Sequence, residues 1–321
     1  MVALLDDSMA RQLRLVSQDV NVLVLPILFR HVIMVLPEHV SRFTATLLPK
    51  RKNYIPALKS KLHLLPRPLS SYHVDTWVMV INDQRPSIET ALANIGPVLT
   101  GLSKLVISGQ NLSSNAFWLR QHAIHPTDMM IVHHGSPHLV NFYDPIFRRV
   151  THLYTSITHG HRYSSVSDIP RLTHLAVHTR PDLPDNTATK VATSLHTILN
   201  SCERLEMLVL TMSGLELSDD RKLCWSRWLE KCLADSRFVF LPFPRDLRVE
   251  WGSIIRGQAT VWDRAKSWQM QAIVREDEDV KIPPRLYFGD HWEIDLVQRD
   301  DYEPPEDPEA ESEKSFHLGQ L

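Results

Sequence analysis

The stretch Leu205-Glu206-Met207-Leu208-Val209-Leu210 carries the pattern that decides the fold, three apolar side chains spaced as leucine-x-x-leucine-x-leucine. Residues 102–107 and 172–177 repeat it. Weaker copies are centred on Trp77, Met129, Leu153 and Phe238. The centres of successive copies lie 22 to 33 residues apart, which is the length of one strand, one helix and two turns. A chain with this period is predicted to stack its repeats side by side, because no single repeat can bury its apolar face alone.

The segments between these copies have helical character. We predict helices over residues 86–95, 114–121, 137–148, 185–200 and 219–233. The fourth is the clearest, because Val191, Leu195 and Ile198 fall on one stripe. The alternation predicts an α/β fold, a leucine-rich-repeat-like solenoid of strands and helices with a parallel sheet on one face. A doubly wound α/β domain would alternate too, but no glycine-rich phosphate loop follows any predicted strand.

Composition changes along the 321 residues divide the chain into regions. The solenoid is expected over residues 25–275 with a C-terminal helical cap, followed by an extension at 276–298. Residues 299–321 hold eight acidic residues, two basic ones and three prolines, which predicts a disordered tail. Because the total charge is -2, the rest of the chain carries +4, which is too weak a charge to indicate nucleic-acid binding.

Targeting signals are weak. The longest clean apolar runs, such as residues 22–29, are too short to span a bilayer. Asp6 and Asp7 stand where a signal peptide would carry basic residues. The three cysteines form no Cys-x-x-Cys pair and fit a reducing compartment. We therefore expect an intracellular protein, cytoplasmic or nuclear, that does not bind membranes.

Tryptophan is concentrated near the C-terminal end of the predicted solenoid. Five of the eight tryptophans fall between residues 225 and 268. We expect these aromatic side chains to seal the open end of the stack, which must be covered for the protein to stay soluble. An aromatic binding patch is the alternative interpretation.

Histidine is unusually dense in the middle of the chain, where ten of 17 lie within 57 residues. They are His122, His125, His133, His134, His138, His152, His159, His161, His174 and His178. A metal site needs three or four of them to converge, with carboxylates behind them, and few carboxylates are nearby. No Gly-x-Ser-x-Gly elbow or cysteine nucleophile is recognisable. We expect no catalysis and no cofactor; the alternative is a metal-binding protein or hydrolase using the histidine-rich loops at 133–178.

Aligning the repeats places their x positions in two polar rows. The first row is Asp75, Ser103, Thr127, Thr151, Thr173, Glu206 and Ser236, and the second is Thr76, Lys104, Asp128, His152, His174, Met207 and Arg237. Such rows are predicted to lie on a solvated concave face. That face is either simply hydrated or binds a partner. In the second case the residues that bind the partner are expected to be Lys104, Asp128, His152, Tyr154, His174 and Arg237. The two histidines are expected to make this binding depend on pH at about pH 6.

Five short segments, taken in order, carry a family resemblance. Leu13-Arg14-Leu15-Val16-Ser17 is followed by Leu28-Phe29-Arg30-His31-Val32. Later come Thr173-His174-Leu175, Ile198-Leu199-Asn200-Ser201-Cys202 and Trp262-Asp263-Arg264-Ala265. Together they resemble fungal (basidiomycete-type) F-box proteins, in which the last F-box helix leads into a leucine-rich-repeat-like C-terminal domain.

The resemblance implies a substrate-recognition domain whose F-box docks the Skp-type adaptor of a cullin ubiquitin ligase. The Leu-Pro-x-Glu segment typical of an F-box does not precede Leu13 in this sequence. We therefore expect residues 1–24 to form an F-box remnant helix, with the F-box truncated or missing. Adaptor binding is then expected only if an F-box is completed upstream. The expected function is a non-catalytic protein-interaction scaffold with an unknown protein partner.

Overall fold

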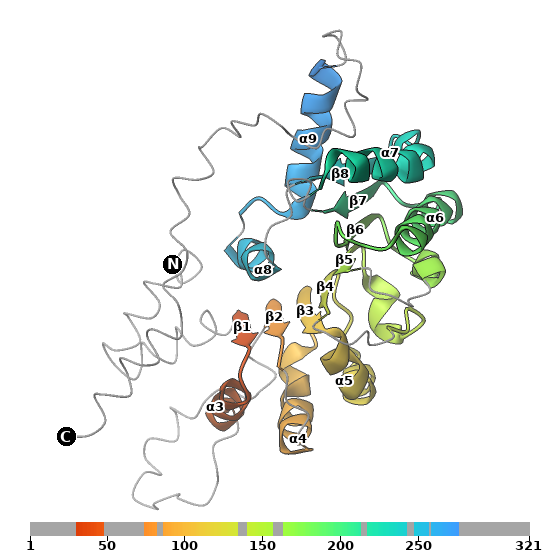
Figure 1. Ribbon diagram of the computed structural model, residues 1–321. Coiled ribbons are helices and arrows are strands. Elements are labelled where there is room, and N and C mark those ends of the chain that lie inside the picture. Colours follow the sequence, from red (N-terminus) through yellow and green to blue (C-terminus); the bar gives the residue numbers. More distant parts are fainter. Residues whose placement is uncertain are drawn as a thin grey trace, which may run out of the picture. The chain divides into compact units, whose positions relative to one another are not determined.

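Eight parallel strands form one sheet in the computed structural model (Figure 1). They are β1 (His31–Met34), β2 (Thr76–Met79), β3 (Lys104–Ser108), β4 (Asp128–Val132), β5 (His152–Ser156), β6 (His174–His178), β7 (Met207–Thr211) and β8 (Phe238–Leu241). Their order in space is their order in the chain. The structure describes residues 30–47, 74–81, 86–133, 140–156, 163–212, 217–242, 247–256 and 258–275. All of these belong to the first of two units of the chain, Met1–Tyr287.

Helices connect the strands. The α-helices are α3 (Pro37–Leu47), α4 (Pro86–Ile95), α5 (Gly109–Gln121), α6 (Asp185–Ser201), α7 (Asp219–Leu233), α8 (Leu247–Arg256) and α9 (Val261–Arg275). Short 3₁₀ helices are η5 (Gly96–Leu99), η6 (Pro145–Arg149) and η7 (Tyr163–Asp168). Helices α3 to α7 lie on one side of the sheet, and α8 and α9 lie on the other (Figure 1). The predicted α/β alternation with an all-parallel sheet is confirmed.

Most of the predicted helices are present with similar bounds. Those predicted at 86–95 and 219–233 coincide with α4 and α7, and α6 is one residue longer than predicted. Helix α5 begins five residues earlier than predicted, at Gly109. The reason is Ser108, whose hydroxyl caps the helix by accepting a hydrogen bond from the backbone N–H of Asn111 at 3.1 Å.

The helix predicted over residues 137–148 is wrong in the part that the structure describes. Residues 140–144 are not helical, and only Pro145–Arg149 forms the short helix η6. Proline inside a longer helix would remove a hydrogen bond and clash with the preceding turn. At the start of η6 it is tolerated, and the Asp144 carboxylate caps this end by accepting from the Ile146 N–H at 3.2 Å.

One face of the sheet packs against α3 to α7. Successive side chains of a strand point to opposite faces of the sheet. The leucine positions of the sequence pattern therefore lie on this face and align across neighbouring strands. Leu105, Leu153, Leu175, Leu208 and Phe238 are all at most 2% exposed. This is the apolar face that the repeat pattern predicted.

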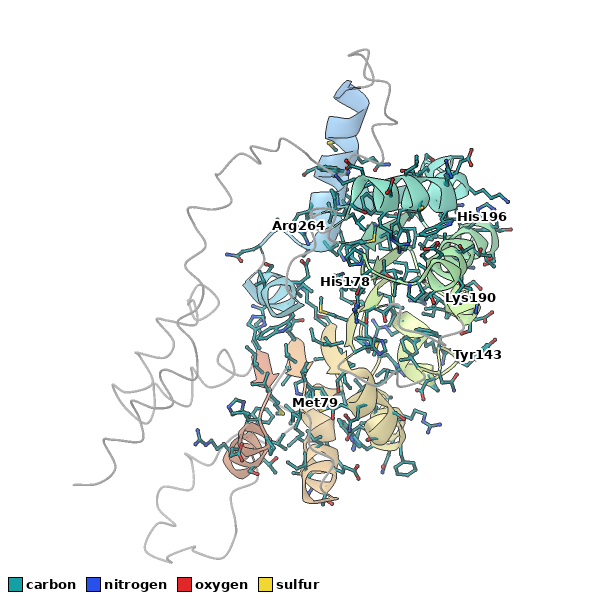
Figure 2. The ribbon with its side chains drawn as sticks, viewed as in Figure 1. Met79, Tyr143, His178, Lys190, His196 and Arg264 are labelled. Atoms are coloured by element: carbon teal, nitrogen blue, oxygen red, sulfur yellow. The ribbon has the colours of Figure 1, made fainter. Side chains whose placement is uncertain are left out.

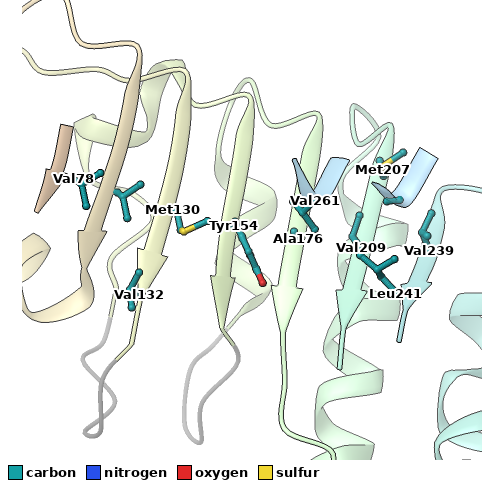
Figure 3. Packing of buried hydrophobic residues seen from close by; sticks show 12 residues of the cluster. Val78, Met130, Val132, Tyr154, Ala176, Met207, Val209, Val239, Leu241 and Val261 are labelled. Carbon is teal, nitrogen blue, oxygen red and sulfur yellow. The ribbon is translucent and has the colours of Figure 1, made fainter. Parts of the chain in front are cut away.

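The opposite face is also apolar, which contradicts the predicted solvated concave face. Its central row is Val78, Val106, Met130, Tyr154, Ala176, Val209 and Val239, all at most 4% exposed. Figure 3 shows this row crossing neighbouring strands, with Val261 of α9 against it. Trp251 and Ile254 of α8 pack on the same cluster. The two C-terminal helices therefore bury a face that the polar x positions alone predicted to be wet.

Several predicted regions lie outside the described residues. These are the remnant helix at 1–24, the extension at 276–298 and the acidic tail at 299–321. Within the described parts of the chain, no helix has the length and apolar character needed to cross a membrane.

Candidate partner-binding rim

The two predicted polar rows come together at the N-terminal ends of the strands. The register pairs Lys104 with Asp128, Asp128 with His152, and His152 with His174. The predicted alignment of the second row is therefore correct for these strands. We use the name rim for Asp75, Ser103, Lys104, Thr127, Asp128, Thr151, His152, Thr173, His174 and Glu206.

A ladder of hydroxyl groups runs along the rim. Thr127 Oγ1 donates to the carbonyl of Ser103 at 3.1 Å, Thr151 Oγ1 to the carbonyl of Thr127 at 3.2 Å, and Thr173 Oγ1 to the carbonyl of Thr151 at 3.2 Å. Ser103 Oγ extends the ladder to the carbonyl of Asp75 at 3.1 Å. The same carbonyls accept backbone N–H groups from the next strand, for example Thr151 N to Thr127 O at 2.8 Å. Each rung thus fixes the register of two neighbouring strands.

Replacing Thr151 by valine is expected to lower the free energy of unfolding by about 1–2 kcal/mol, because the shape is kept while the hydroxyl that bonds both Thr127 and His152 is lost. The matched control is Thr193→Val on α6. Its hydroxyl also bonds a backbone carbonyl, that of Thr189, but is exposed, so a change within about 0.5 kcal/mol is expected. Urea unfolding of both variants checks this, and equal losses would contradict it.

The threonines of the hydroxyl ladder also contact both rim histidines. His152 Nδ1 lies 2.9 Å from Thr151 Oγ1, and His174 Nδ1 lies 2.9 Å from Thr173 Oγ1. A threonine hydroxyl can donate to this nitrogen or accept from it, according to the imidazole tautomer. In either tautomer the contact holds the ring in place, and an added proton gives the ring a positive charge.

The two imidazoles stack on each other and contact a tryptophan from α9. Their ring centroids are 4.3 Å apart and the ring planes differ by 18°. Trp262 meets both rings at centroid distances of 5.5 Å, with interplanar angles of 67° to His152 and 80° to His174. Asp128 Oδ1 lies 3.7 Å from His152 Nδ1. The side chains of His152 and Asp128 are 30% and 38% exposed, whereas His174 is buried.

The surroundings favour the neutral form of both histidines. Burial is the largest cause, and it lowers the pKa of His152 from its ordinary value; Lys266 lowers it further, while Asp128 and Glu206 oppose the change. For His174, burial and the neighbouring His152 lower the pKa to about 4. The two histidines are therefore uncharged at neutral pH.

Two of the six predicted binding residues have structural roles instead. Tyr154 is 4% exposed beneath α8 and α9, and burial raises its pKa to about 12. Arg237 turns its guanidinium to the carbonyls of Leu199, Cys202 and Leu205. Tyr154 is covered by α8 and α9, whereas the Arg237 side chain is 28% exposed. Lys104, Asp128 and His152 are part-exposed on the rim, and His174 is largely covered.

Metal binding finds no support in the part of the chain that is described. No group of three or more histidine, cysteine, aspartate or glutamate side chains is arranged there to hold an ion. His134, His138, His159 and His161, on which the alternative interpretation partly depended, lie outside the described residues.

Sequence reasoning did not find Trp262 and Lys266 as neighbours of the rim. The tryptophan cluster was expected to close the end of the stack, but Trp262 contacts β5 and β6 within the sheet. The only available signal in the sequence was the row of apolar residues between the leucines, because such a row must be covered by other side chains.

No protein-family model matches the chain, and no match is found among curated proteins or solved structures.

Proposed function

We propose that this protein is a non-catalytic protein-interaction scaffold built as a leucine-rich-repeat-like solenoid. Three observations support the solenoid. The strands follow one another in chain order, all are parallel, and the copies of the sequence pattern recur 22 to 33 residues apart. Stacked repeats of this kind present one continuous row of side chains along the sheet, which suits binding to an extended protein surface.

The rim is the partner-binding surface in this proposal. The observation that carries it is the alignment of part-exposed Lys104, Asp128 and His152 on three neighbouring strands, with exposed Glu206 beyond them. Their backbone positions are fixed by the hydroxyl ladder, so these side chains are held in a defined order before a partner arrives. Preorganised polar groups of both charges favour selectivity among partners more than raw affinity.

The proposal includes the F-box type of substrate recognition. Its support is the order of the five segments that resemble fungal F-box proteins, of which Thr173-His174-Leu175 leads into β6 and Trp262-Asp263-Arg264-Ala265 lies in α9. A titration with a purified Skp-type adaptor separates ligase docking from recognition. We expect binding weaker than micromolar for this chain, and tight binding would show that it docks the ligase itself.

A charge-reversal variant tests the rim. Lys104→Glu combined with Asp128→Lys keeps the net charge and inverts two neighbouring rim charges. The control combines Lys190→Glu on α6 with Glu230→Lys on α7, two exposed helix positions; Figure 2 shows Lys190 on the outer helices. Quantitative affinity capture is expected to enrich the same proteins with wild type and control, and to lose some of them with the rim variant. If the rim variant captures the same set, the rim is not the binding surface.

A further inference from the structure

Helix α9 is held on the sheet at the two rim histidines. Trp262 contacts both imidazoles, and Val261 and Ala265 pack into the apolar row beside them. The same helix carries Lys266, whose charge acts on both histidines. Docking of α9 therefore brings a desolvating indole and a cation to the same pair of rings.

Burial beneath α9 and the positive charge of Lys266 both disfavour protonation of His152 and His174. A proton added to either ring places positive charge on imidazoles stacked 4.3 Å apart. The charged groups that act on the pair are Asp128 on β4 and Glu206 before β7, which favour the charged form, and Lys266 on α9, which disfavours it. Of these, only Lys266 moves with the helix.

We infer that docking of α9 and protonation of His152 and His174 oppose one another, so that acid promotes release of α9 from the sheet. Release would uncover part of the apolar row, including Ala176 on β6 and Val239 on β8, the strands that α9 contacts. The protein would then present a hydrophobic face in acid that it conceals at neutral pH.

The direction follows from proton linkage. The docked state holds the pKa of both histidines below the ordinary value of 6.5, and that of His174 at about 4. Docking is therefore fully supported above about pH 6.5 and weakens as the pH falls below that value, and His174 stops contributing below about pH 4. One group can change the docking constant by at most about tenfold per pH unit in this window. The sensitive range therefore extends from about pH 6.5 down to about pH 4.

Hydrogen–deuterium exchange of the full chain tests the inference. Protection of the α9 amides, corrected for the intrinsic exchange rate, is compared with that of α6 at about pH 7 and about pH 5. We expect protection of α9 to fall by about tenfold or more relative to α6. A dye that binds exposed apolar surface should show increased fluorescence over the same range.

The variant His152→Phe/His174→Phe keeps two stackable rings that cannot be protonated, so its α9 protection should not change with pH. His196→Phe, on α6, is the control and should retain the wild-type response. If wild-type α9 is equally protected at both pH values, or loosens equally in the double variant, the inference is wrong. In the latter case another group, such as the half-buried His178, causes the acid response.

A second measurement does not depend on folding of the double variant. Nuclear magnetic resonance titration should give a pKa of His174 well below 6.5 in the wild type. Trp262→Leu removes the indole, and the pKa should then rise toward 6.5 because coupling between docking and protonation is reciprocal. An unchanged pKa of His174 in Trp262→Leu would show that α9 does not control protonation of the pair.

Discussion

Replacing Glu250 by leucine is expected to lower the free energy of unfolding by about 3–5 kcal/mol, the largest loss we predict for a single substitution. Glu250 on α8 and Arg264 on α9 form an ion pair with 2.5 Å between Oε2 and Nη2. Their side chains are only 1% and 12% exposed. Without the carboxylate, the guanidinium remains in an environment that water hardly reaches and loses the charge-assisted hydrogen bond to Glu250.

The double variant Glu250→Leu/Arg264→Met separates the cost of a lone charge from the value of the pair. Since burying two charges costs nearly as much as their attraction returns, the double variant should be within about 1 kcal/mol of wild type or more stable. Arg180→Ala is the control, because Arg180 and Asp182 are 74% and 63% exposed, so that water screens their attraction and the loss of stability should be far smaller than for Glu250→Leu. Urea unfolding of the three variants and the wild type measures these changes. A double variant as unstable as Glu250→Leu would contradict this account.

The repeat pattern predicted local structure well because local structure depends on neighbouring residues. Alternation within a strand and a 3.6-residue period within a helix are properties of short segments, so β3, β6, β7 and helices α4, α6 and α7 could be located from sequence. The register of the rim also followed, because stacked repeats in the same orientation align equivalent positions. Pro145 shows the limit, since a proline within an apparently periodic segment should have ended the predicted helix.

The packing of α8 and α9 on the second face of the sheet was not predicted, because it depends on contacts between residues that are distant in sequence. Trp262 contacts His174 across 88 positions of sequence, and no periodicity encodes such a pair. A signal was nevertheless present: Val106, Met130, Val209 and their equivalents are apolar at the x position between the last two leucines. On this face, the first position of each strand is polar and the position two residues later is apolar. Only the edge of the face is therefore exposed to water, and the rim lies along that edge.

Arg237 was predicted to bind a partner, but its hydrogen bonds in the structure indicate that it stabilises the fold. The two roles predict different effects of its replacement on stability. Its guanidinium donates to the carbonyls of Leu199 at 2.6 Å, Cys202 at 3.3 Å and Leu205 at 3.4 Å. It also makes a two-point contact with Asp235, at 3.0 Å from Nε and 2.7 Å from Nη2. One planar group therefore ties the start of β8 to the end of α6 and the turn that follows it.

Arg237→Ala is expected to lower the free energy of unfolding by about 2–3 kcal/mol, because three carbonyls and one carboxylate lose a charged donor. Arg237→Lys should recover only part of this, since an ammonium group cannot reproduce the planar fork. Lys104→Ala is the matched control on the rim and should change stability by less than about 0.5 kcal/mol. Thermal and urea unfolding distinguish these outcomes. If Arg237→Ala costs no more than Lys104→Ala, the guanidinium network does not stabilise the fold, and Arg237 would again be a candidate for partner binding.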